Sequence, residues 1–179
     1  MDLAITFHPE AIMAATKHPV SGPRPKRILI VDDHPIVRRG LARLVSDERD
    51  LVVCGEAENA QEGLLAIGKL KPDLVVVDIS PSGKTGLGLI KDLRSQHPQL
   101  PVLVMSMHDE QIYAERALRA GGRGYIMKQA GGKILMEAIR QVLSGQVYVS
   151  SKISARILQR VHIKEKLHLK HVPGGTKEK

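Results

Sequence analysis

Five side chains that are suited to phosphate chemistry stand directly after short apolar segments: Asp32, Asp33, Asp78, Ser106 and Lys128. Such segments suit strands that are buried in a parallel sheet, and the carboxyl ends of parallel strands meet at one edge. Three carboxylates that converge there repel one another. Because oxygen ligands with room for water favour magnesium, the sequence predicts a Mg²⁺ site at this edge.

Asp78 is the candidate nucleophile of this group, because aspartyl phosphate is an established covalent intermediate. Ser106 can donate a hydrogen bond to a phosphoryl oxygen, and Lys128 can pair with another. The alternative is that Asp78 only caps a turn, since turn residues follow it from Ser80 to Gly83. The residues around Asp78 favour neither interpretation over the other. The polar residues at the other strand ends favour a nucleophilic role for Asp78 over a turn cap.

The elements that must position these side chains alternate along the chain. Strands are expected over 27–31, 51–57, 74–77, 102–105 and 124–127, and helices over 35–45, 60–70, 85–96, 109–120 and 134–143. Five strand–helix units with short connections predict an α/β fold, with a doubly wound parallel sheet and helices on both faces.

The helix over 35–45 is predicted to be amphipathic. Its expected apolar face consists of Ile36, Val37, Leu41, Leu44 and Val45, and its arginines are expected largely on the other face: Arg38, Arg39 and Arg43. His34, His97 and His108 fall in predicted turns at scattered positions, so we expect exposed histidines and no histidine metal cluster.

Composition separates the body of the chain from its ends. The 179 residues carry a net charge of +8, and 42% of them are hydrophobic, which is enough for a core. Residues 1–25 are expected to form a leader without regular structure. Residues 151–179 hold eight lysines and arginines against two glutamates. No secretory signal or membrane-spanning stretch is evident, so the cytoplasm is the expected location.

The motifs VDDHPIVRRGL, VVVDIS, VLVMS and AGGRGYIMK together resemble the receiver domain of bacterial response regulators. The spelling DDHPIVRRGL and the ending IRQVLSGQVYVS resemble the NarL/FixJ-type (LuxR-type) branch. The resemblance runs from about Lys26 to about Arg160. It implies a flavodoxin-like fold with strand order 2-1-3-4-5, made of a flexible leader (1–25), a receiver domain (26–146), and a linker helix with a basic tail (147–179).

The resemblance also implies a role in a two-component phosphorelay, as a regulator and not an enzyme. A sensor histidine kinase would phosphorylate Asp78. Mg²⁺ would be bound by Asp33, Asp78 and the backbone carbonyl of Ser80, with Asp32 acting through a metal-bound water. Lys128 and Ser106 would contact the phosphoryl group, and Ser106 and Tyr125 would form the switch. The output face, which could form a homodimer, would combine the helix from Asp109 with the strand at Tyr125.

The end of the chain departs from the branch. Residues 161–179 are too few for the helix-turn-helix that this branch carries, so direct sequence-specific DNA binding is left undecided. Two interpretations stay open here, a shortened transcription regulator and a stand-alone receiver.

Two other functions are weighed against the regulator. An Asp-nucleophile Mg²⁺-dependent phosphatase usually has a second acid two residues after the nucleophile, and Ser80 stands there. A non-specific nucleic-acid binder would use the basic tail.

Overall fold

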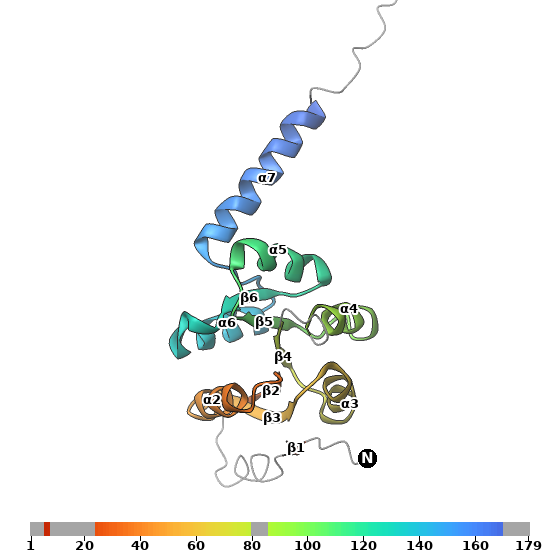
Figure 1. Ribbon diagram of the computed structural model, residues 1–179, viewed down its shortest axis with the longest axis vertical. Coiled ribbons are helices and arrows are strands. Elements are labelled where there is room, and N and C mark those ends of the chain that lie inside the picture. Colours follow the sequence, from red (N-terminus) through yellow and green to blue (C-terminus); the bar gives the residue numbers. More distant parts are fainter. Residues whose placement is uncertain (1–5, 8–23, 80–85, 170–179) are drawn as a thin grey trace, which may run out of the picture. The chain divides into compact units, whose positions relative to one another are not determined.

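The computed structural model describes residues 6–7, 24–79 and 86–169 (Figure 1). The chain divides into two compact units, Met1–Tyr148 and Val149–Lys179. The first unit holds the sheet and its covering helices, and the described part of the second unit is mainly helical. Within the described ranges, no helix combines the length and the apolar character that a membrane crossing requires.

Six strands form one sheet in the order β1-β3-β2-β4-β5-β6. The neighbours from β3 to β6 pair in parallel, and β1 pairs with β3 in the antiparallel direction. When only the five parallel strands are numbered along the chain, the order β3-β2-β4-β5-β6 becomes 2-1-3-4-5, which confirms the predicted order. The strands are β1 (Thr6–Phe7), β2 (Lys26–Val31), β3 (Leu51–Ala57), β4 (Leu74–Asp78), β5 (Val102–Ser106) and β6 (Gly124–Met127).

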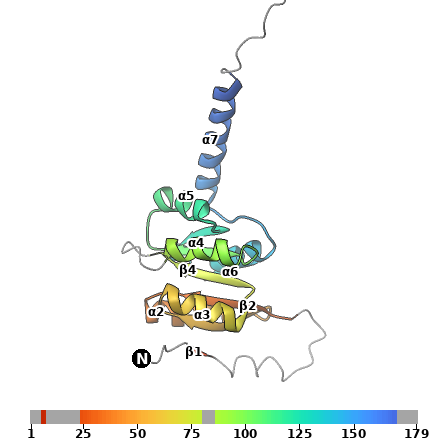
Figure 2. The same ribbon diagram turned by 90° about the vertical axis from the view of Figure 1, so that its right-hand side faces the viewer.

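Helices cover both faces of this sheet, as predicted for a doubly wound fold. α2 and α6 lie on one face and α3, α4 and α5 on the other, the latter turned toward the viewer in Figure 2. Their bounds are α2 (Pro35–Ser46), α3 (Ala60–Leu70), α4 (Gly86–Gln96), α5 (Glu110–Ala120) and α6 (Gly132–Leu143), with a short 3₁₀ turn, η1 (Lys128–Ala130), before α6.

The core is aliphatic, and the central strands are its most buried part. All five residues of β4 and all five of β5 are buried. On one face these strands pack against apolar side chains of α2 and α6, among them Leu41, Val45, Leu135 and Ile139. Continuous burial explains why β4 reads as an unbroken apolar run up to Asp78.

The predicted leader contains one short described element, β1. Thr6 pairs with Glu56 and Phe7 with Gly55. β3 is the outermost parallel strand, and β1 pairs with backbone groups at its outer edge that the parallel sheet leaves unpaired. No regular structure is predicted for the leader, because its prolines and glycine disfavour it, and β1 lies before those residues.

The predicted faces of α2 are wrong at three positions. Ile36 and Leu44 are 85% and 39% exposed, whereas Arg38 is only 8% exposed. Leu41 and Val45 are buried as expected. The arginine points inward because its guanidinium meets acidic and carbonyl partners from β3 and β2, which a helical period does not reveal.

The second unit contains α7 (Ser151–Leu169). The sequence predicts a helical stripe only as far as Val161, and the apolar period is ambiguous beyond it. The structure continues the helix to Leu169. The predicted charged end from Pro173 lies outside the described residues.

Cys54 provides a test of the packing of β3. It is fully buried, and burial raises the pKa of its thiol to about 11. We expect the native protein to react with a thiol reagent such as DTNB at pH 8 only at the rate of its unfolding, because the thiolate is the reactive form. Urea-unfolded protein should react at once, and fast labelling of the native protein would contradict this packing.

Candidate functional site

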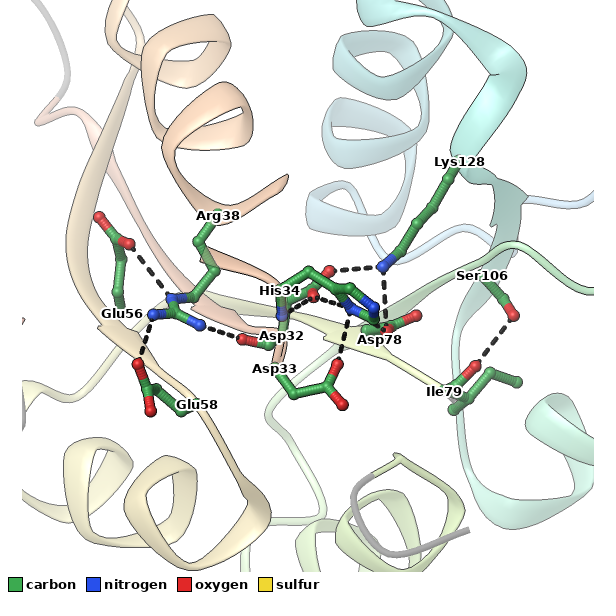
Figure 3. A network of polar contacts seen from close by, with 10 residues as sticks. All are labelled: Asp32, Asp33, His34, Arg38, Glu56, Glu58, Asp78, Ile79, Ser106 and Lys128. Carbon is green, nitrogen blue, oxygen red and sulfur yellow. Dashed lines mark hydrogen bonds and ion pairs between the residues drawn. The ribbon is translucent and has the colours of Figure 1, made fainter. Parts of the chain in front are cut away.

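The carboxyl ends of four parallel strands bring the predicted side chains to one edge of the sheet. Asp32 directly follows β2, Asp78 ends β4, Ser106 ends β5 and Lys128 directly follows β6. Asp32, Asp78 and Ser106 are buried, with exposures of 2%, 5% and 0%. Figure 3 shows Lys128 reaching across this edge toward the two carboxylates.

Lys128 joins two of the three carboxylates. Its Nζ lies 2.7 Å from Asp32 Oδ2 and 3.0 Å from Asp78 Oδ2. The side chain is only 7% exposed, and those of Asp32 and Asp78 are 1% and 6% exposed. One buried cation therefore compensates two buried anions, which leaves the cluster short of positive charge.

The surroundings of Asp78 disfavour its ionised form. Burial raises the pKa of its carboxyl group above the usual range, and the charges of Asp32 and Asp33 act in the same direction. The hydrogen bond from Lys128 opposes this shift without cancelling it. An additional cation at this place would therefore stabilise the ionised, nucleophilic form of Asp78.

Asp33 lies on the open side of the cluster, where His34 joins it. The Asp33 side chain is 45% exposed. His34 Nδ1 lies 2.8 Å from Asp33 Oδ1 and 3.1 Å from Asp32 Oδ1. His34 is exposed, as predicted from its position in a turn. The structure adds that its ring lies beside the carboxylates, and the signal for this was its position directly after the two aspartates.

Arg38 holds the backbone of the turn that carries Asp32 and Asp33. Its Nη1 donates a hydrogen bond to the Asp32 carbonyl oxygen at 2.6 Å. Its Nη2 donates to Glu58 Oε1 at 2.7 Å, and its Nε lies 3.6 Å from Glu56 Oε2. The guanidinium thus ties the turn that carries Asp32 and Asp33 to the end of β3 (Figure 3).

Ser106 and Tyr125 meet at the backbone of His108. Ser106 Oγ donates to the Ile79 carbonyl oxygen at 3.0 Å and accepts the His108 N–H at 3.1 Å. The Tyr125 hydroxyl donates to the His108 carbonyl oxygen at 2.9 Å. Tyr125 is 1% exposed, and burial raises the pKa of its phenol. The two predicted switch residues are therefore linked through one peptide segment.

The carboxylates of this cluster fit a hard divalent cation. Ligand atoms of Asp32, Asp33, His34 and Asp78 all lie within 4.8 Å of one another. The exposed sides of Asp33 and His34 leave room for water, which Mg²⁺ retains in most protein sites. Ser80, whose backbone carbonyl is the predicted third ligand, lies outside the described residues.

The family model for the response regulator receiver domain matches residues 28–140. Response regulator GacA of Pseudomonas protegens is 38% identical over 132 residues, which cover 74% of this chain and 62% of GacA. The oxygen regulatory protein NreC of Staphylococcus haemolyticus is 32% identical over 133 residues, covering 74% of this chain and 61% of NreC. The chain thus spans about three fifths of the length of these curated relatives.

Solved structures agree with this match. A LuxR-family two-component response regulator from Aurantimonas sp. has a TM-score of 0.70 at 32% identity, covering 76% of this chain and 97% of that chain. The receiver domain of the putative response regulator NarL from Mycobacterium tuberculosis has a TM-score of 0.65 at 29% identity, covering 69% of this chain and 100% of that one. Because the family model covers residues 28–140 and relatives and solved structures of this branch match the same chain, this chain belongs to the response regulator receiver domain family, in its NarL/LuxR-type branch.

Proposed function

We propose that this chain is the phosphorylation-controlled module of a two-component system and works in the cytoplasm. A sensor histidine kinase would donate a phosphoryl group to Asp78. The observation that carries this proposal is the placement of Asp78, a buried carboxylate at the end of β4, 3.0 Å from Lys128 and beside two further aspartates.

The transfer is a displacement at phosphorus. A carboxylate oxygen of Asp78 forms the new P–O bond, and the P–N bond of the kinase phosphohistidine breaks, leaving a histidine that takes up a proton. Lys128 is placed to stabilise charge on the phosphoryl oxygens, because its Nζ already lies beside Asp78 Oδ2. The chain's later return to the free carboxylate would be a slow hydrolysis by water.

Mg²⁺ would be bound by Asp33, Asp78 and the Ser80 carbonyl, with Asp32 acting through water. When bound, it would supply charge stabilisation to the transferring phosphoryl group. Asp32 is well held for that role. Its backbone N–H donates to the Ala57 carbonyl oxygen at 3.1 Å, and its Oδ1 accepts the His34 N–H at 2.8 Å.

Phosphorylation would act on the rest of the molecule through Ser106. Turning its hydroxyl toward a phosphoryl group on Asp78 costs its hydrogen bond to the Ile79 carbonyl. The His108 segment, which Ser106 and Tyr125 both hold, would then shift. This local change would bias the face formed by α5 and β6, a candidate surface for homodimer formation.

A transcriptional output is also part of the proposal. Two relatives are described as a transcriptional regulatory protein (DegU of Brevibacillus brevis) and a transcriptional activator protein (ExaE of Pseudomonas putida). Both match only part of their length to this chain, at 56% and 63%. We propose that this chain regulates transcription through contacts with other proteins. Non-specific binding of nucleic acid by the basic tail is the alternative.

Intact-mass measurement after incubation with a small phosphodonor tests the function. We expect one phosphoryl adduct in the presence of Mg²⁺, labile to base, and none after the metal is removed with EDTA. Peptide mapping should place the adduct on the segment that contains Asp78. An adduct elsewhere, or none in protein that binds Mg²⁺, would contradict the proposal. Steady turnover of a generic phosphomonoester would instead favour the phosphatase alternative.

A further inference from the structure

His34 is placed differently from an ordinary residue before a helix. It is the N-cap of α2, but its side chain makes no capping hydrogen bond. N-cap side chains commonly accept the free N–H groups of the first helical turn. Here the imidazole is directed instead into the carboxylate cluster, as Figure 3 shows.

The backbone fixes this direction. The His34 N–H donates to Asp32 Oδ1 at 2.8 Å, and the His34 carbonyl accepts the Arg38 N–H at 3.1 Å. Pro35 follows at the first position of α2, which limits the turn further. The ring is therefore held at the open side of the cluster, with its side chain 59% exposed to solvent.

The spacing of the donor atoms matches a common metal ion. An octahedral ion with ligands at about 2.1 Å places neighbouring ligand atoms about 3 Å apart. His34 Nδ1 lies 2.8 Å from Asp33 Oδ1, 3.1 Å from Asp32 Oδ1 and 3.8 Å from Asp78 Oδ2. The imidazole nitrogen thus occupies the position of one more ligand beside the carboxylates.

We propose that His34 is a nitrogen ligand of the receiver's cation site, and that it raises the affinity of the site for divalent transition-metal ions relative to Mg²⁺. Carboxylates and water suit Mg²⁺, whereas imidazole suits ions such as Co²⁺, Ni²⁺ and Zn²⁺. The relative affinity of the site for these metal ions and for Mg²⁺ would then depend on this one side chain. The proposal rests on the proposed function, because it uses the same cation site.

Calorimetric titration of the full chain with Co²⁺ and, separately, with Mg²⁺ tests the role. His34→Phe keeps a ring of similar size and removes the nitrogen, and His34→Ala removes the ring. For both variants we expect the Kd for Co²⁺ to rise about tenfold or more, while the Kd for Mg²⁺ changes by less than about threefold. His97→Ala, a histidine outside the cluster, is the matched control and should leave both values unchanged.

A spectroscopic signal gives an independent readout. Co²⁺ bound to the wild type should produce a paramagnetically shifted imidazole N–H resonance, which should be absent in His34→Phe and retained in His97→Ala. Because the chain has eight histidines, only a signal that His34→Phe removes counts as support.

Two outcomes would overturn the proposal: an equal change of both Kd values in the His34 variants, or an imidazole signal that persists without His34. Neither would affect the proposed function if the wild type still binds Mg²⁺ and gains its phosphoryl group. Loss of the proposed function would appear separately, as a wild-type chain without a phosphoryl adduct.

Discussion

Asp78→Asn is expected to abolish phosphorylation completely and, in metal-free buffer at pH 7, to make the fold more stable. The amide has no carboxylate oxygen to attack phosphorus, so the intact-mass adduct disappears. It also removes a buried negative charge from beside Asp32 and Asp33, while Lys128 keeps its 2.7 Å contact with Asp32 Oδ2. We expect a gain of the order of 1 kcal/mol in the free energy of unfolding.

The gain should depend on pH in one direction. Burial raises the pKa of the Asp78 carboxyl group in the folded state above its value in the unfolded chain. The folded protein therefore binds this proton more tightly, and protonation favours folding. The free energy of unfolding of the wild type falls furthest below that of Asp78→Asn when the pH is above the folded-state pKa of Asp78. This difference becomes smaller as the pH falls through the folded-state pKa toward the unfolded-state pKa.

Urea unfolding of both proteins in EDTA, at pH 7 and again near pH 4.5, measures this difference. Asp92→Asn is the matched control, because Asp92 is exposed on α4. It should keep both the phosphoryl adduct and the wild-type stability. A destabilised Asp78→Asn at pH 7, or a gain that grows as the pH falls, would contradict the charge imbalance described for the cluster.

Arg38→Met is expected to lower the free energy of unfolding by about 1–3 kcal/mol and to weaken Mg²⁺ binding. The substitution removes the donor at 2.6 Å from the Asp32 carbonyl oxygen and the contacts with Glu58 and Glu56. Because Arg38 holds the turn that presents Asp32 and Asp33, its loss should loosen two carboxylates of the cation site as well as the packing of α2.

The neighbouring Arg39 provides a close control, since it is exposed on the same helix. Arg39→Met should change stability by less than about 0.5 kcal/mol and leave Mg²⁺ binding unchanged. Arg38→Lys keeps the charge but lacks the planar fork, and it should fall between the wild type and Arg38→Met. If stability falls in Arg38→Met while the Mg²⁺ affinity stays the same, Arg38 supports only the packing and not the site.

Residues from four separate segments meet through these contacts. Lys128 from the end of β6 joins Asp32 and Asp78, and Arg38 joins Asp32 to the end of β3. Lys128 is shared by two carboxylates, and Arg38 is linked to Asp32 through the backbone carbonyl oxygen, so the path combines ion pairs with one hydrogen bond to the backbone. The arrangement explains why the loss of Arg38 at one end is expected to affect a cation bound near the other.

The amino-acid sequence by itself determined the alternation of strands and helices and the edge at which the candidate side chains meet. Buried parallel strands require unbroken apolar runs such as Leu74–Val77, and a polar residue after such a run marks the strand end. Because parallel strands share one direction, the segments ending at Asp32, Asp78, Ser106 and Lys128 could be placed together without a structure.

Only the tertiary structure decided the inward position of Arg38, the exposure of Ile36 and the place of His34. A helical pattern reports only the spacing of apolar residues. It does not reveal that the inner side of α2 offers Glu58 and the Asp32 carbonyl as hydrogen-bond acceptors for Arg38. Likewise, the direction of the His34 ring depends on carboxylates contributed by two different strands. Contacts between segments distant in the chain leave no local pattern, which is why the sequence placed Arg38 and Ile36 on the wrong faces of α2 and did not show what the exposed His34 ring faces.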